Sequence, residues 1–152
     1  MNLRPLILVL VLSSCTVKTS TDPPIVRRPI EGTWKLISGT LIEKGDTTVT
    51  DYTKGQSFIK VINDTHFAFL LHDLAGGTDS TAVYSSGGGK YELNGDNYIE
   101  HLEYCTAREW EGHDFTFTVT IKNDTLVQQG KEEVESAGVS RINIEKYIRL
   151  TR

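Results

Sequence analysis

Hydrophobic and polar residues alternate along most of this chain, and residues 114–121 show the pattern most clearly. In the stretch D-F-T-F-T-V-T-I the apolar side chains share one face, and the Asp and Thr side chains share the other. A period of two, rich in β-branched and aromatic residues, predicts a half-buried β-strand. The same pattern predicts further strands at residues 33–41, 57–62, 66–72, 81–84, 89–93, 98–105, 125–129 and 142–150.

Short turn signals separate several of these strands. Asn-Asp at 63–64 and 123–124, and Asn-Gly-Asp at 94–96, tolerate the left-handed conformations of tight hairpins. Strands joined mainly by hairpins form an antiparallel meander, which removes its exposed edges by closing. We therefore predict an all-β fold for residues 31–152, an antiparallel up-and-down β-barrel of eight or nine strands. We expect 131–137 to be a charged loop or strand extension, and 87–89 (Gly-Gly-Gly) to be a bulge or connection at the rim.

The first residues predict a secretory signal peptide at 1–14. Arg4 precedes a short apolar run that is too short to span a bilayer, and small residues follow it. Leu-Ser-Ser-Cys at 12–15 resembles the bacterial lipobox, which implies that Cys15 carries fatty acyl chains such as palmitate. The alternative is an ordinary signal peptide with a chance cysteine. Several acyl chains would give stable membrane anchoring.

A change in composition marks the domain boundary. All four prolines lie at or before Pro29, and all thirteen glycines lie at or after Gly32. We interpret residues 15–30 as a flexible, lipid-anchored linker. Thr16 stands directly after the lipidated cysteine, where an Asp would hold an enterobacterial lipoprotein at the inner membrane, so we expect an outer-membrane lipoprotein of a bacterial cell envelope. The partner is then the membrane, reached through the N-terminal lipid.

Charge excludes one class of partner. The chain has 16 Lys and Arg against 20 Asp and Glu, and removing residues 1–14 takes away only Arg4, which gives 15 − 20 = −5. An acidic protein without a basic cluster is a poor candidate for nucleic-acid binding. We expect a monomer that does not bind nucleic acid.

The start of the predicted barrel carries a family resemblance. Gly32-Thr33-Trp34 before a full meander resembles the lipocalin and calycin families. The E-G-x-W-K-L-x-S opening at 31–38 and the G-G-x-Y-x-L-x-G-x-x-Y-x-E stretch at 88–100 are similar to the small lipocalin-like lipoproteins of Bacteroidetes. The resemblance implies that Gly32 and Trp34 close one end of the barrel, and that a basic residue of the last strand, Arg149, packs over the Trp.

The strand at 98–105 offers a candidate ligand site. Tyr98, Glu100, Leu102 and Tyr104 share the face with more apolar bulk, so we predict that they point inward. A buried carboxylate needs a partner, and Tyr147 and Arg149 share a face of the last strand. These six residues would bind a small, partly hydrophobic or amphipathic ligand, as in a carrier or scavenger. The alternative is a filled barrel with a structural Glu100–Arg149 pair, acting as an interaction module in an envelope complex.

The other face of the same strand holds His101, Glu103 and Cys105. The first and last of these lie about 13 Å apart along a strand, too far for one metal ion to collect all three. We predict no metal site and no cofactor, with His101 and Glu103 facing solvent. The chain contains none of the familiar hydrolase, protease or nucleotide-binding motifs, so we do not expect an enzyme. A turn around Trp110 is expected at the rim.

Overall fold

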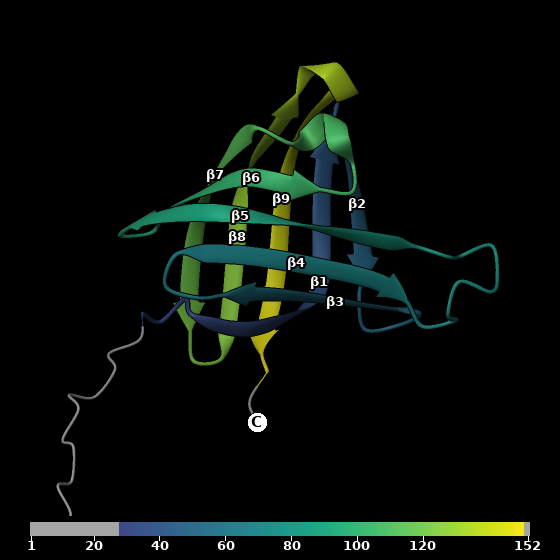
Figure 1. The fold of residues 1–152 in the computed structure, drawn as a ribbon, viewed down its shortest axis with the longest axis horizontal. Helices are drawn as coiled ribbons and strands as arrows, with labels where there is room; N and C mark the ends of the chain where they lie inside the picture. Colours follow the sequence, from purple (N-terminus) through teal and green to yellow (C-terminus); the bar gives the residue numbers. More distant parts are fainter. Residues whose placement is uncertain (1–27, 151–152) are drawn as a thin grey trace, which may run out of the picture.

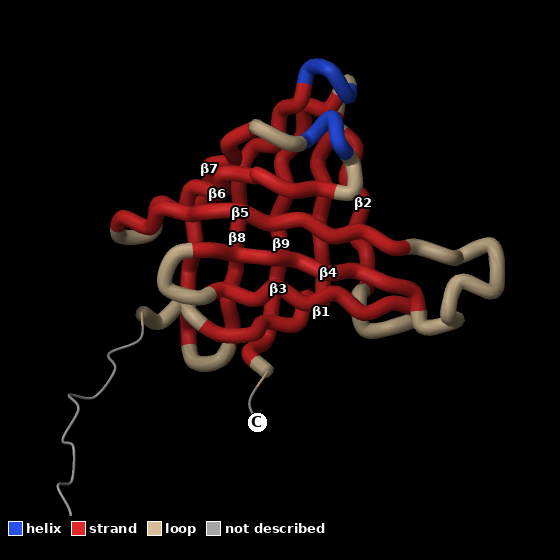
Figure 2. The backbone as a smooth tube through the Cα atoms, viewed as in Figure 1, coloured by secondary structure: helices blue, strands red, loops and turns tan. Residues whose placement is uncertain are grey.

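The computed structural model describes residues 28–150 of the chain, and these residues form one antiparallel sheet of nine strands (Figure 1). Two short 3-10 helices lie together at one end of the sheet (Figure 2). The predicted signal peptide, Cys15 and linker residues 15–27 lie outside the described residues. No helix within 28–150 is long and apolar enough to cross a membrane. The elements are β1 (Gly32–Glu43), β2 (Asp46–Asp51), β3 (Gln56–Ile62), β4 (His66–Asp73), β5 (Tyr84–Asn94), β6 (Asn97–Cys105), η1 (Arg108–Trp110), β7 (His113–Lys122), β8 (Thr125–Val134), η2 (Glu135–Ala137) and β9 (Val139–Arg149).

The sheet closes into a barrel because β1 pairs with both β3 and β9. Eight strands make the closed ring, in which β3 to β9 pair in the order in which they follow along the chain. Strand β2 is an extra strand paired with β1. The predicted fold class, an antiparallel up-and-down barrel of lipocalin-like form, is therefore confirmed. The predicted turns are also present, as the β3–β4, β5–β6 and β7–β8 hairpins.

Strand β2 was not predicted, since its six side chains are almost all exposed and give no alternation of apolar and polar residues. Its hairpin with β1 is instead fixed by the turn. Lys44 and Gly45 both have positive φ, +52° and +90°, which is the requirement of the two-residue hairpin turn whose twist matches that of the strands. The strand predicted at 81–84 is wrong, because only Tyr84 belongs to a strand, as the first residue of β5.

The triple glycine lies inside β5 and not at a loop, where close backbone packing requires it. An added Cβ at Gly88 would lie 2.5 Å from the carbonyl oxygen of Phe67 in β4, and one at Gly89 would overlap the carbonyl oxygen of His101 in β6. The bulge itself is on the partner strand, where the register shifts past Glu103. Of the two predictions for 87–89, the rim connection is wrong, whereas a bulge is present as the register shift at Gly88 and Gly89. The glycines allow the backbones of β4 and β6 to approach β5 closely.

One end of the barrel is closed by Trp34. Its side chain is fully buried, its indole nitrogen donates to the Ile30 carbonyl oxygen at 2.8 Å, and the Arg149 guanidinium lies 4.0 Å above the ring centroid. Arg149 also donates to the carbonyl oxygens of Glu31 and Pro29 at 2.7 and 2.6 Å. The structure thus places Trp34 and Arg149 in the closing arrangement that the family resemblance implies.

Gly32 is needed for this closure. Its φ is +144°, and an added Cβ would lie 2.5 Å from an Arg149 guanidinium nitrogen. Ile30 is fully buried beside this plug, so residues 28–30, which were assigned to the linker, pack onto the barrel. Residues 28–150 hold every strand and every buried core residue that the structure describes. A truncated protein of residues 16–152 therefore keeps all of the described barrel.

Candidate functional site

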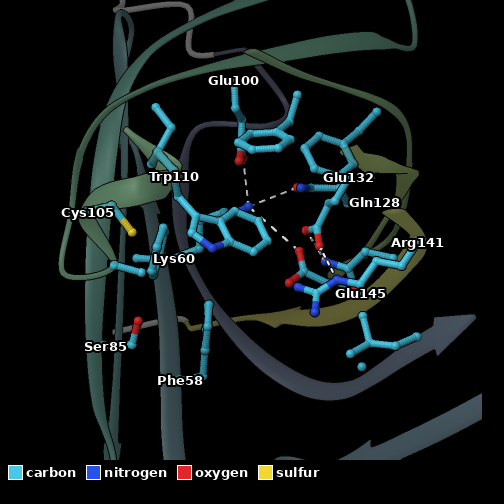
Figure 3. Close-up of a pocket in the computed structure, with 18 of the residues that line it drawn as sticks. Phe58, Lys60, Ser85, Glu100, Cys105, Trp110, Gln128, Glu132, Arg141 and Glu145 are labelled. Atoms are coloured by element: carbon cyan, nitrogen blue, oxygen red, sulfur yellow. Dashed lines mark hydrogen bonds and ion pairs between the residues drawn. The ribbon is translucent and has the colours of Figure 1, made fainter. Parts of the chain in front are cut away.

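Away from the Trp34 plug, the barrel encloses a cavity of about 360 Å³ (Figure 3). This volume lies at the lower end of the range of small-molecule sites. Strands from around the barrel and helix η1 contribute to its wall. The lining residues are Gly39, Leu41, Thr50, Tyr52, Phe58, Lys60, Phe69, Ser85, Glu100, Leu102, Cys105, Ala107, Trp110, Phe115, Phe117, Gln128, Glu132, Arg141, Asn143 and Glu145.

Aromatic side chains form much of the apolar part of this wall. Phe58 of β3 and Phe69 of β4 stack with ring centroids 5.8 Å apart and planes 12° apart. Trp110 of η1 packs on Phe115 of β7 at 5.7 Å. Pairs of this kind hold rings in fixed orientations. The cavity therefore has rigid aromatic surfaces against which a flat or apolar group can pack.

A buried ammonium group stands at the centre of the polar part. Lys60 of β3 is 2 % exposed, and its Nζ donates to Glu100 Oε1 at 2.7 Å and to Gln128 Oε1 at 3.0 Å. Glu145 Oε2 lies 3.9 Å away, and the ring of Tyr147 has its centroid 5.4 Å from the nitrogen. Burial alone would lower the pKa of Lys60, but the charges of Glu100 and Glu145 outweigh it and raise that pKa. The side chain is therefore a fixed cation.

A second polar cluster continues from β8 to β9. Both oxygens of Glu132 are used, because Oε2 accepts from Arg141 Nε and Oε1 accepts from Asn143 Nδ2, each at 2.7 Å. The Arg141 guanidinium also lies 5.3 Å from the centroid of the Trp110 ring. This cluster connects the sheet to η1 at the end of the barrel opposite the plug.

Glu100 is the most deeply placed carboxyl group of the cavity, at 6 % exposure. Burial raises its pKa, and the positive charge of Lys60 opposes that rise only in part. The Tyr98 hydroxyl beneath it is buried without a hydrogen bond of normal geometry to any described residue. Burial and then the charge of Glu100 raise the pKa of Tyr98. The floor of the cavity therefore favours forms with less negative charge.

Four of the six predicted ligand residues point into the barrel. Glu100 and Leu102 line the cavity. Tyr98 and Tyr147 are fully buried in the core instead of lining the cavity. The Tyr147 hydroxyl donates to Glu145 Oε2 at 2.7 Å, so this residue orients a cavity carboxylate from outside the lining.

Tyr104 and Arg149 do not line the cavity, so the prediction that they lie in its wall is wrong. Tyr104 is 67 % exposed, because the bulge at Glu103 reverses the alternation of β6 and turns the next side chain outward. The same shift turns Cys105 toward the cavity wall. Arg149 belongs to the Trp34 plug, so the predicted Glu100–Arg149 pair is also wrong; the partner of Glu100 is Lys60.

Most of the polar lining was not predicted: Lys60, Gln128, Glu132, Arg141, Asn143 and Glu145. The alternation of β3 could have identified Lys60, because this residue shares a strand face with the apolar residues Phe58 and Ile62. In β9 the rule that apolar residues point inward gives the wrong prediction. Its apolar Ile148 is 39 % exposed on the outside, whereas Asn143 is 8 % exposed on the inside.

The outer face of β6 carries His101, whose Nδ1 lies 2.7 Å from Asp114 Oδ1. The hydrogen bond to Asp114 raises the pKa of His101, with a smaller contribution from Glu92, whose carboxylate is 3.5 Å from Nε2. This cluster is on the surface, away from the cavity. Within residues 28–150 no group of three or more His, Cys, Asp or Glu side chains is arranged to hold a metal ion.

Comparison with known proteins adds no information on the barrel or its cavity. The sequence matches no protein-family model and no curated protein.

Proposed function

We propose that this chain is a binding protein of the bacterial cell envelope, not an enzyme, which holds a small, partly hydrophobic molecule inside its barrel. The observation that carries the proposal is the cavity of about 360 Å³, which combines aromatic surfaces with a few buried polar groups. Binding sites for small molecules commonly have this composition. A filled interior, which the rival role as an interaction module requires, would leave no such space.

The proposed cellular setting comes from the N-terminal sequence. A lipobox-like Cys15 and a tether of about a dozen residues before Arg28 fit a domain held at a membrane by acyl chains. We infer an outer-membrane lipoprotein of the lipocalin-like type, with the barrel as a carrier or scavenger near the membrane. Mass spectrometry of the protein from its host would test the anchor, since acylation adds a defined mass that Cys15→Ser abolishes.

Native mass spectrometry tests the binding function directly. The full-length protein is purified gently from its own host, and its mass is compared with that of the denatured chain. The expected result is an added small molecule that is released on denaturation. A mass equal to that of the chain and its lipid alone, with no uptake of an apolar fluorescent probe, contradicts the proposal.

Two neighbouring positions on β6 supply a matched pair of variants. Cys105 lines the cavity, whereas Tyr104 is exposed on the outer surface. Cys105→Trp fills space inside the barrel and is expected to displace the co-purified molecule. Tyr104→Trp places the same side chain outside and is expected to retain it. Loss of the molecule from Tyr104→Trp alone would instead locate the site on the outer face.

A further inference from the structure

The cavity has more carboxyl groups than cations. Among its described lining residues, Glu100, Glu132 and Glu145 are acidic and Lys60 and Arg141 are basic, so the formal charge is 2 − 3 = −1. Both cations are already paired, Lys60 with Glu100 and Arg141 with Glu132, each at 2.7 Å. Glu145 Oε2 lies 3.9 Å from the same Lys60 nitrogen, so three carboxyl groups share two cations within the described lining.

Polar atoms that face this cavity also lack partners. Within residues 28–150, Glu145 Oε1 has no hydrogen bond or ion pair, and Glu100 Oε2 has no hydrogen bond of normal geometry, although the Tyr98 hydroxyl lies beside Glu100. The Glu100 and Glu145 side chains are only 9 % and 15 % exposed. Gln128 is 1 % exposed, and its Oε1 accepts from Lys60 while its amide nitrogen has no partner among the described residues. Buried polar atoms are normally satisfied by protein, water or ligand. These three atoms are thus available to a bound molecule: two acceptors and one donor.

The aromatic surfaces of the cavity also favour a positively charged group. Trp110 already has the Arg141 guanidinium 5.3 Å from its ring centroid, which is the geometry of a cation–π contact. Phe115 packs against this Trp, and Phe58 also lines the cavity. Ring faces carry partial negative charge, so they attract cations and repel anions.

We infer that the ligand is an organic amine, a protonated nitrogen on a compact, mainly apolar or aromatic body. This inference rests on the proposed function, because it assigns a chemical class to the ligand of the same cavity. The ammonium group donates to the free oxygens of Glu100 and Glu145, and a hydroxyl or carbonyl of the ligand accepts from Gln128. An anionic ligand would meet three carboxyl groups and two cations that are already paired.

Three indole compounds test the charge of the ligand. Tryptamine, tryptophol and indole-3-acetate share a ring system and differ in an ammonium, hydroxyl or carboxylate head. Their affinities for the protein of residues 16–152 are measured by isothermal titration calorimetry near neutral pH. We expect tryptamine to bind at least tenfold more tightly than tryptophol, and indole-3-acetate to bind least tightly.

Paired variants test where the ammonium group lies. Glu145→Gln removes a charge at constant shape, and it is expected to bring the tryptamine-to-tryptophol affinity ratio close to one. Glu92→Gln removes a charge from the outer surface, where the side chain is 72 % exposed, and is expected to leave the ratio unchanged. Because a ratio is measured within each variant, a uniform loss of folded protein does not imitate the effect.

The outcomes separate the two proposals. Tryptophol or indole-3-acetate binding as tightly as tryptamine overturns the amine assignment and leaves the barrel a binding protein. A tryptamine preference that survives Glu145→Gln overturns the placement of the ammonium at this carboxyl group. If none of the three compounds binds and the protein from its host carries no small molecule, both the binding function and the amine assignment are overturned.

Discussion

Replacing Lys60 with methionine tests the central interaction of the cavity. Methionine has a similar length and no charge, so Lys60→Met removes the ammonium group that contacts Glu100 at 2.7 Å and Gln128 at 3.0 Å. Within the described residues, Glu100 then has no cation in contact, because its only ion pair is with Lys60. A buried carboxylate without a partner is among the most costly single defects of a core.

The size of the effect follows from the separation and burial of the two groups. At 2.7 Å the attraction is about 6 kcal/mol at an effective dielectric constant of about 20, before the cost of removing both ions from water is counted. Breaking such a pair from one side typically costs about 3–5 kcal/mol. Glu100→Leu should cost less, because Lys60 keeps Gln128 and the Glu145 carboxylate at 3.9 Å. The double variant should recover most of the stability, since both charges are then gone.

Urea unfolding of the four proteins at pH 7 and pH 5 measures these differences. The pKa of Glu100 is raised by burial, and losing Lys60 removes the main opposing charge. A raised carboxyl pKa stabilises the folded state below the unfolded value of about 4.3, and this contribution is lost as pH rises through the folded pKa. The defect of Lys60→Met is therefore expected to be larger at pH 7 than at pH 5.

Two results would refute this reasoning. One is a defect of equal size at both pH values, which would mean that Glu100 does not carry the penalty. The other is additivity of the two single variants within about 0.5 kcal/mol, which is the behaviour of residues that do not interact. In either case solvent in the cavity, and not Lys60, would be the main partner of the carboxyl group.

Three further predictions concern residues of the barrel that do not line the cavity. Tyr98→Phe should be neutral or stabilise the fold by up to ~1 kcal/mol, because the hydroxyl is buried without a hydrogen bond of normal geometry. Tyr91→Phe should cost ~1 kcal/mol, because that hydroxyl donates to a carbonyl oxygen at 2.7 Å. Thermal unfolding compares the two variants, and a clear loss of stability in Tyr98→Phe would show that the Tyr98 hydroxyl is hydrogen-bonded to Glu100. Gly89→Ala should cost at least ~2 kcal/mol in urea unfolding, since the new Cβ overlaps backbone of β6; a cost near zero would mean that the strands separate easily. His101→Ala should lose less than ~1 kcal/mol. The loss should be complete below the unfolded pKa of about 6.5 and fade as pH rises through the folded pKa, which the hydrogen bond to Asp114 raises. A defect that grows with pH would contradict that pairing.

The fold was predictable because most strands bury one face, so apolar and polar residues alternate along them. Strand β2 shows the limit of that signal, since it buries almost nothing and is held by pairing with β1 and by its turn. The triple glycine shows another limit. Absence of side chains suggests a loop, but here it reflects the approach of β4 and β6 to the backbone of β5, a long-range fact that local sequence does not carry.

The site was predictable only where the alternation is regular. Glu100 and Leu102 were placed correctly because they precede the bulge of β6, and Tyr104 was placed wrongly because it follows it. A bulge of one residue reverses every later side chain of a strand. The polar interior of β9 could not be found by the rule that apolar residues point inward, because Asn143 is buried there and Ile148 is not.

The polar interior is itself an argument for binding. The pairing of β1 with β3 and β9 closes the barrel, and an apolar core packs inside it. Replacing a buried ion pair by hydrophobic residues is often neutral or stabilising. The charged groups around Lys60 are thus not explained by stability, and they line a cavity instead of being packed shut. If the Lys60→Met, Glu100→Leu double variant is as stable as the natural protein and no longer prefers tryptamine over tryptophol, then the network serves the ligand and not the fold.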